Sequence, residues 1–292
     1  MTRTMLGALM LAACAAQAEV RVTDDYGKPV VLAAPARRVV SLAPHLTELM
    51  YAAGAGERMV GAVQYSDYPD DAKHLPRIGS EASIDLEAVV ALGPDLVVAW
   101  PNAGSARAVE RIAALGIPVF RSEPRELEDI ARTLEILGRL AGTETAARPA
   151  AAAFRARTAT IAHRHASRPP VRVFYQVWDR PLITVNGDHV ISKVMRLCGG
   201  ENVMADLPAL APEIDRELVL RADPEAIVAS GADGARPPWL DAWRAFGGLA
   251  AVRGDNLYAI RPELLQRHTP RLLDGADELC RILEAVRRRR AL

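Results

Sequence analysis

Two segments of the chain repeat one another, and this repeat limits the possible folds more than any other feature of the sequence. They begin at Ile84 and Ile214, 130 positions apart, and align without a gap as IDLEAVVALGPDLVVAW and IDRELVLRADPEAIVAS. Each copy is typical of a capped short helix, a turn at proline and a buried strand. A chain with such a pair is expected to fold as two similar lobes that face each other.

The stretch between the two copies favours one long helix. Residues 143–166 are rich in alanine and arginine, which are strong helix formers, and a helix of this length would span roughly 35 Å. Its only large apolar side chains are Phe154 and Ile161, too few for a continuous core stripe. Pro149 is expected to kink the first turns or to move the start of the helix later. We interpret the stretch as a spacer that joins two bodies.

Strand-like and helix-like segments alternate in both halves, which predicts mostly parallel sheets flanked by helices. The predicted fold class is therefore α/β, with two lobes, one long connecting helix and a ligand cleft between the lobes. The expected boundaries are 19–142 for the N-terminal lobe, 143–168 for the connecting helix and 169–292 for the C-terminal lobe.

Composition and charge exclude some classes of partner. The 292 residues have a formal net charge of zero, so no overall field attracts nucleic acid or anionic lipid. Half of the residues are hydrophobic and a quarter are charged, as in globular proteins. The run Arg287–Arg290 favours a solvated last helical turn over a basic tail. We expect no nucleic-acid partner.

The first residues, 1–18, have the pattern of an export signal and are too short to span a membrane. Cleavage after Ala18 would release a soluble periplasmic protein, and we favour this route because the sequence AQA lies at the expected distance. The alternative is a lipoprotein signal in the run Leu11–Cys14, which would leave Cys14 acylated at the new N-terminus.

The remaining cysteines, Cys198 and Cys280, are an even pair in an oxidising compartment. This predicts a disulfide between the last helix and the helix that ends at Cys198. Two separate buried thiols are the alternative.

Ligands of open parallel sheets bind beyond the carboxyl ends of the strands. The residues expected at these ends are Pro44, His45, Tyr65, Trp100, Trp178 and the loop 261–266. Aromatic residues are only 5% of the chain, yet three of these ends carry one. Core packing explains each ring singly, whereas their shared position favours a broad apolar ligand surface between the lobes.

Catalytic patterns are missing from the sequence: it contains no G-x-S-x-G, P-loop, C-x-x-C or H-E-x-x-H. We therefore expect no enzyme, no resident cofactor and no metal site built by the chain. His163 and His165 are two positions apart and point to different helix faces. His45 is a candidate ligand for a metal already held in a macrocycle, but we favour an ordinary polar role in the cleft or at the surface.

Glu87 and Glu217 occupy equivalent positions in the two repeat copies. A carboxylate in the first turn of a helix contributes about 0.3–1 kcal/mol to helix stability, which explains either one alone. A matching pair of exposed acids also suits docking onto a two-fold symmetric partner that presents arginines. We favour the docking interpretation once the family resemblance given below is included.

Five segments in order, RVVSLAPHLTEL, GAVQYSDYP, IDLEAVVALGPDLVVAW, LCGGENV and RHTPRLLDGADELC, resemble the cobalamin-binding family of periplasmic proteins from ABC uptake systems. More broadly, they are similar to substrate-binding proteins of the helical-backbone metal-receptor type. The resemblance runs from about Val20 to Val286. It implies two Rossmann-like lobes joined by one rigid helix. It also implies a monomer that captures cobalamin and delivers it to an inner-membrane ABC permease dimer with its ATPase.

The resemblance also implies roles for single residues. Those near a corrinoid in the cleft would be Pro44, Tyr65, Trp100, Trp178 and Glu263; Glu87 and Glu217 would dock on permease arginines, and Cys198 and Cys280 would form the disulfide. The sequence departs from the family at Glu81 and near Ala211, where the family has ligand-contacting tryptophans. A smaller corrinoid, haem or a ferric siderophore is the alternative ligand.

Overall fold

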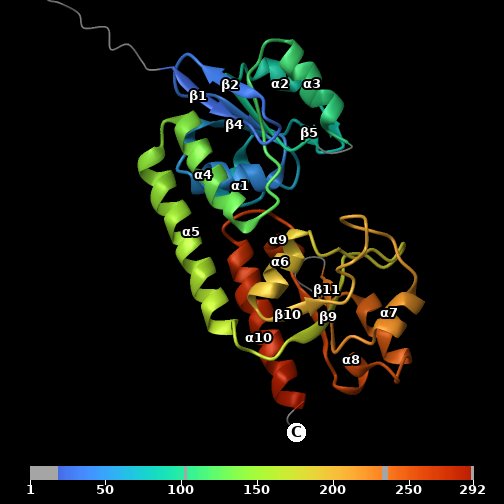
Figure 1. The fold of residues 1–292 in the computed structure, drawn as a ribbon. Coiled ribbons are helices and arrows are strands. Elements are labelled where there is room, and N and C mark those ends of the chain that lie inside the picture. The colour runs from blue at the N-terminus through green and yellow to red at the C-terminus, as the bar shows by residue number, and fades with distance from the viewer. Residues whose placement is uncertain (1–18, 102–103, 232–235, 291–292) are drawn as a thin grey trace, which may run out of the picture.

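The computed structural model describes residues 19–101, 104–231 and 236–290, so the predicted export signal and Cys14 lie outside the described residues. The chain forms an upper and a lower lobe in Figure 1, with helix α5 running alongside both. Within the described ranges, no helix combines the length and the apolar character needed to cross a bilayer.

The N-terminal lobe is built on a four-stranded parallel sheet of order β4-β3-β7-β8. Its strands are β3 (Val39–Ser41), β4 (Met59–Ala62), β7 (Leu96–Ala99) and β8 (Val119–Arg121). Two small antiparallel hairpins join β1 (Val20–Thr23) to β2 (Pro29–Leu32) and β5 (Gly79–Ser80) to β6 (Ser83–Ile84). The helices are α1 (Pro44–Ala52), α2 (Leu86–Ala91), α3 (Ala106–Ala114) and α4 (Leu127–Ala141), with short 3₁₀ turns at Gly56–Arg58 and Asp70–His74.

The C-terminal lobe has a second four-stranded parallel sheet of order β10-β9-β11-β12. Its strands are β9 (Val171–Gln176), β10 (Gly200–Asn202), β11 (Ala226–Ser230) and β12 (Leu257–Ile260). Its helices are α6 (Val190–Leu197), α7 (Arg216–Ala222), α8 (Ala250–Arg253), α9 (Pro262–Leu265) and α10 (Leu272–Arg290), with a 3₁₀ segment at Pro238–Ala245.

The two sheets have the same strand order, which confirms the predicted duplication and the α/β fold class. Each repeat copy supplies the same parts: α2 with β7 in one lobe, and α7 with β11 in the other. Both strands are buried along their whole length, because helices cover both faces of a parallel sheet. The helix caps differ, since Asp85 accepts a hydrogen bond from the amide of Ala88 whereas the Asp215 side chain makes no such bond within the described part of the chain.

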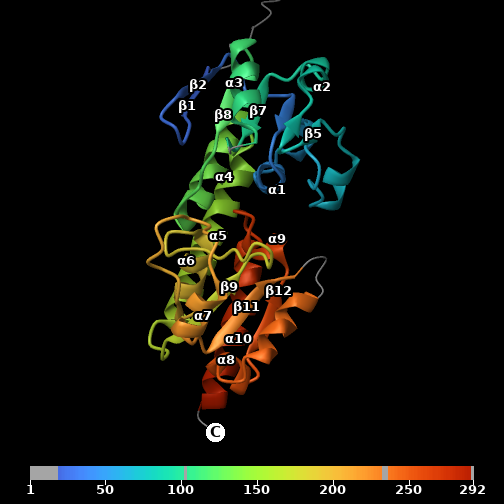
Figure 2. The same ribbon diagram turned by 90° about the vertical axis from the view of Figure 1, so that its right-hand side faces the viewer.

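Helix α5 covers Glu144–His165 and lies within the expected span. It begins at Glu144, so Pro149 lies inside the helix and does not move its start. The preceding helix α4 ends at Ala141 and is capped by Gly142, whose φ of 69° is the left-handed conformation that glycine adopts readily. A short turn therefore folds α5 back against α4, as Figures 1 and 2 show.

The view of α5 as a spacer without a core stripe is wrong in one respect. Its buried face consists of Ala147, Ala151, Phe154, Ile161 and His165, a stripe at helical spacing. A Cβ atom added at Gly138 of α4 would overlap the Cβ of Ala147. Because alanine faces glycine, the two helix backbones approach closely. The small residues Ala147 and Ala151 are therefore buried together with Phe154 and Ile161 and belong to the same apolar stripe.

Ion pairs attach α5 to both lobes. Arg155 pairs with Glu135 of α4 at 2.5 Å, and Arg157 pairs with Asp274 and Asp277 of α10 at 2.8 and 2.7 Å. Because these contacts lie on opposite lobes, α5 is attached to both lobes along the side of the molecule.

The predicted disulfide is confirmed: Cys198 and Cys280 are joined, and the bond links the end of α6 to α10. The run Arg287–Arg290 is more than a solvated turn. Arg287 donates to the carbonyls of Pro169, Cys198 and Gly199, while Arg289 donates to the carbonyl of Asp255 and Arg290 to that of Pro170. These arginines fasten the end of α10 to the C-terminal lobe.

Candidate ligand-binding cleft

The carboxyl ends of β3 and β7 lie side by side where the connections of the N-terminal sheet change direction. Such a switch point is where open α/β sheets bind ligands. His45 follows β3 in the first turn of α1, and Trp100 follows β7. Their rings meet edge to face with centroids 5.5 Å apart. The switch point therefore brings together two of the predicted ligand residues.

A cavity of about 620 Å³ lies between the lobes at this level. Its lining comes from Trp100 and residues 123–126 of the N-terminal lobe, and from residues 188–190, 193, 210, 211, 266 and 268 of the C-terminal lobe. This volume is within the range of about 300–1,000 Å³ that small-molecule sites occupy. Among the predicted ligand residues, Trp100 lines the cavity, and so does Ala211, near which the sequence departs from the family.

Lys193 of α6 connects the lobes at one edge of the cavity. Its ammonium group donates to the carbonyl oxygen of Arg125 at 2.7 Å and pairs with the carboxylate of Glu126. The contact crosses from the C-terminal lobe to the start of α4, so this edge of the cleft is closed by a charged pair.

Three histidines gather at the cleft. Burial lowers the pKa of His45 to about 3, with smaller electrostatic effects of Arg267 and, once it is protonated, of His268. Burial lowers the pKa of His189 and of His268 to about 4 in each case. The rings of His45 and His268 are 5.9 Å apart, and Nε2 of His45 is buried without a hydrogen-bond partner among the described residues. All three imidazoles are neutral at pH 7.

Sequence reasoning found His45 but missed His189 and His268. His189 caps α6 by accepting a hydrogen bond from the amide of Ile191, and His268 lies two residues beyond the loop 261–266 that the strand-end rule selected. Extending that loop by two positions would have found His268. Across 19–101, 104–231 and 236–290, no group of three or more His, Cys, Asp or Glu side chains is arranged to hold a metal ion.

Two predicted aromatic residues are exposed instead of packed in the core. The Tyr65 side chain is 75% exposed and its backbone has a φ of 64°. Trp178 is 56% exposed, and its indole Nε1 donates to the carbonyl of Arg180 at 3.1 Å. The core-packing alternative is therefore wrong for these two rings. Trp100 is partly buried and packs against the core as well as lining the cavity.

The remaining predicted ligand residues have local partners. Pro44 is buried at the first position of α1. Glu263 pairs with Arg261 at 3.6 Å. Glu81 lies in the turn between β5 and β6, where partial burial raises the pKa of its carboxyl group and the charge of Arg267 opposes that rise. Their roles toward a ligand stay predictions.

Comparison with known proteins identifies the family. Residues 39–264 match the family described as "Periplasmic binding protein", which is more than half of the chain. The chain belongs to the periplasmic binding protein family.

Several relatives of this periplasmic binding protein are similar along most of their length. It is 36% identical over 254 residues to the vitamin B12-binding protein of Vibrio cholerae, covering 87% of this chain and 91% of the relative. It is 38% identical over 251 residues to the vitamin B12-binding protein of Yersinia pestis, covering 86% and 88%.

Solved structures agree with this relationship. The structure of the periplasmic vitamin B12 binding protein BtuF of Vibrio cholerae superposes with a TM-score of 0.79 at 36% identity, covering 87% of this chain and 98% of that one. The heme-binding protein RhuT from Roseiflexus sp. RS-1 superposes with a TM-score of 0.75 at 22% identity, covering 86% and 99%, and shares the fold.

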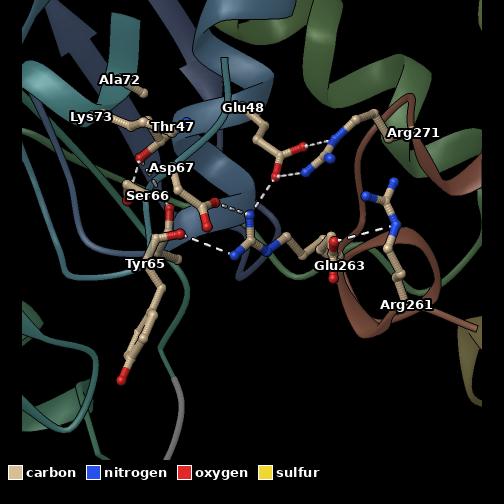
Figure 3. A network of polar contacts seen from close by, with 12 residues as sticks. Thr47, Glu48, Tyr65, Ser66, Asp67, Ala72, Lys73, Arg261, Glu263 and Arg271 are labelled. Carbon is tan, nitrogen blue, oxygen red and sulfur yellow. Dashed lines mark hydrogen bonds and ion pairs between the residues drawn. The ribbon is translucent and has the colours of Figure 1, made fainter. Parts of the chain in front are cut away.

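A second contact between the lobes of this periplasmic binding protein is an ion network (Figure 3). Glu48 of α1 is 2% exposed and accepts hydrogen bonds from Arg267 and from Arg271 of the C-terminal lobe. Arg267 also pairs with Asp67 at 2.8 Å, and the guanidinium of Arg271 stacks over the ring of Tyr68 at 3.8 Å. Sequence reasoning missed this network, because its acids and its arginines are about 200 residues apart.

The two predicted docking acids are presented separately by the two lobes. Glu87 and Glu217 are exposed in the first turns of α2 and α7, the equivalent short helices of the repeat. In Figure 1, α2 lies in the upper lobe and α7 in the lower one. Each lobe therefore offers an exposed surface carboxylate at a matching position.

Proposed function

We propose that this protein captures a corrinoid, most readily cobalamin, in the cleft between its lobes and delivers it to an ABC permease of the inner membrane. The observation that carries the proposal is the interlobe cavity, which lies at the switch point of a duplicated fold in a chain 36% identical to vitamin B12-binding proteins. A permease dimer with its ATPase would be the partner. The protein would act as a monomer and without catalysis.

The proposed ligand contacts divide into two kinds. Trp100 offers an aromatic surface inside the cavity, and the exposed rings of Tyr65 and Trp178 would add two more for a broad macrocycle. Gln266 and His268 offer polar groups for amide side chains at the ligand rim. Pro44, Glu81 and Glu263 complete the proposed set around the cleft.

The proposed location is the periplasm, reached through the export signal at residues 1–18 with cleavage after Ala18. Acylation at Cys14 is the alternative and would tether the same binding domain to a membrane. Either route places the cleft in the compartment where the disulfide between Cys198 and Cys280 is stable.

A haem or a ferric siderophore is the second candidate ligand, and one observation favours it. Among the described residues, the buried Nε2 atom of His45 has no partner, and its ring lies 5.9 Å from that of His268, which lines the cavity. A neutral imidazole is a good ligand for iron held in a macrocycle.

Absorption titrations of the purified protein with cyanocobalamin, cobinamide and haemin test these alternatives. We expect saturable binding of cyanocobalamin, with weaker binding of cobinamide because it lacks the lower nucleotide and its contacts. A shifted Soret band with haemin, together with no response to either corrinoid, would replace the proposal by the haem alternative.

Trp100→Ala is expected to weaken cobalamin binding by about 1–3 kcal/mol, or about 5- to 150-fold, because buried aromatic anchors at interfaces contribute this much. Tryptophan-fluorescence titration measures the change. Trp239→Ala is the matched control, since Trp239 is also partly buried but packs in the C-terminal core away from the cleft. A dissociation constant that Trp100→Ala leaves unaltered would return this ring to a purely structural role.

A further inference from the structure

Residues 266–268 belong both to the wall of the cleft and to the ion network that joins the lobes. Gln266 and His268 line the cavity, whereas Arg267 between them reaches into the N-terminal lobe. There its Nη1 atom donates to Glu48 at 2.7 Å and to Asp67 at 2.8 Å, and its Nη2 atom donates to the carbonyl of Tyr65 at 3.0 Å. One side chain therefore connects the C-terminal wall of the cleft to the segment that carries Tyr65.

Contacts with neighbouring residues hold the backbone of the Tyr65 segment, residues 65–67, in an unusual conformation. Its φ of 64° is left-handed, a conformation that a bulky residue adopts only under constraint. Besides Arg267, the constraint comes from Ser66, whose hydroxyl accepts a hydrogen bond from Thr47 at 3.0 Å and whose carbonyl accepts one from Arg77 at 3.0 Å. The Tyr65 ring extends away from these anchors in Figure 3 and is 75% exposed.

The buried carboxylate of Glu48 explains why an arginine is required at position 267. The Glu48 carboxylate is 2% exposed, and Arg267 is 17% exposed. A buried carboxylate needs paired cations and hydrogen bonds. Arg271 supplies a two-pronged contact to the same carboxylate at 3.0 and 2.7 Å, so Glu48 stays neutralised while Arg267 extends to Asp67 and Tyr65.

We propose that Arg267 is a positioning residue for ligand binding: it fixes the Tyr65 segment of one lobe against the wall of Gln266 and His268 on the other, and so assembles the cleft before a ligand arrives. This inference rests on the proposed function, since the ligand used to test it is cobalamin. Arg267 itself need not touch the ligand. Its effect is pre-organisation, because a cleft that is assembled only part of the time binds with an affinity reduced by that fraction.

The first test is a double-mutant cycle. Arg267→Met keeps the length of the side chain and removes its donors, and Arg267→Lys keeps the charge but cannot make the three-way contact. Each is expected to raise the dissociation constant for cyanocobalamin about 10- to 100-fold, which corresponds to a competent fraction of about 1–10%. In a Tyr65→Ala background, the same change at Arg267 is expected to cost less than about threefold, because the residue acts through Tyr65.

The control is Arg157→Met, which removes another arginine that bridges two carboxylates but lies on α5, away from the cleft. It is expected to leave cobalamin affinity unchanged. Thermal unfolding of each variant with and without ligand separates loss of folding from loss of binding. An equal loss of affinity from Arg267→Met in the wild-type and Tyr65→Ala backgrounds would overturn the proposal.

A second readout needs no ligand and separates this proposal from the proposed function. Protein labelled with 3-fluorotyrosine, with the Tyr65 signal assigned through Tyr65→Phe, is expected to show one sharp ¹⁹F resonance for this ring environment and a shifted or exchange-broadened one in Arg267→Met. If cobalamin fails to bind the wild-type protein while this change occurs, the ligand assignment fails and the positioning role stands. An unchanged Tyr65 resonance in Arg267→Met overturns the positioning role.

Discussion

Replacing Glu87 and Glu217 together by lysine is expected to abolish importer-dependent uptake of cobalamin while leaving its binding affinity almost unchanged. Both side chains are exposed on the first turns of α2 and α7, so the substitution alters neither the core nor the cavity. In the proposed complex each carboxylate would meet a permease arginine, and reversal would place like charges in contact. Uptake into proteoliposomes that contain the importer, paired with a binding titration, measures both effects.

The control for this reversal is a second pair of exposed glutamates, Glu57 and Glu201, one in each lobe and without an ion-pair partner among the described residues. Changing both to lysine alters the net charge by the same amount at positions outside the repeat. Uptake is expected to persist in this variant. Normal uptake by the Glu87 and Glu217 double variant would remove the docking role.

Acidification is expected to destabilise the ligand-free protein, with a drop of about 3 kcal/mol in the free energy of unfolding between pH 7 and pH 4 from His45 alone. Burial, with smaller effects from His268 and Arg267, lowers the pKa of His45 from 6.5 to about 3. Between these values the unfolded chain binds a proton that the folded protein excludes. This destabilisation is absent above pH 6.5, grows as the pH falls, and levels off below about pH 3.

Urea unfolding at a series of pH values measures this dependence. Because carboxylates also titrate at acid pH, the informative quantity is the difference between the wild type and His45→Gln, which removes the titrating group and should flatten the curve. His163→Gln is the control, since His163 is exposed on α5. Identical curves for the wild type and His45→Gln would show that His45 is not held neutral by the fold.

Neutral histidines in the cleft also bear on the ligand. His189 and His268 share the lowered pKa of His45, each mainly through burial. At neutral pH they offer hydrogen-bonding or metal-ligating nitrogens and no charge, which suits a macrocycle with amide side chains as well as a haem. The chemistry of the cleft therefore suits both candidate ligand classes. The sequence identity to vitamin B12-binding proteins favours the corrinoid.

The features of the fold that could be predicted from the sequence are those that depend on residues close together in the chain. The repeat at Ile84 and Ile214 predicts two similar lobes because each copy contains the signals for its own helix, turn and strand. Alanine-rich composition predicts α5, since helix propensity acts within a few residues. The strand-end rule placed His45 and Trp100 at the cleft, because the ends of neighbouring parallel strands must meet at one edge of a sheet.

Other features became visible only in the tertiary structure. The network of Glu48 with Arg267 and Arg271 joins residues about 220 positions apart, and no local signal says which acid meets which arginine. The buried stripe of α5 was underestimated for a related reason: Ala147 counts as core only because Gly138 of another helix lets it come close.

The sequence by itself therefore determined the two-lobed α/β architecture, because hydrophobic period, helix propensity and turn signals act through neighbouring residues and because the repeat can be read directly. The tertiary structure alone decided how the two lobes are held against each other. Buried charges and close helix contacts depend on the mutual placement of distant segments, and their energies appear only when folding removes those segments from water.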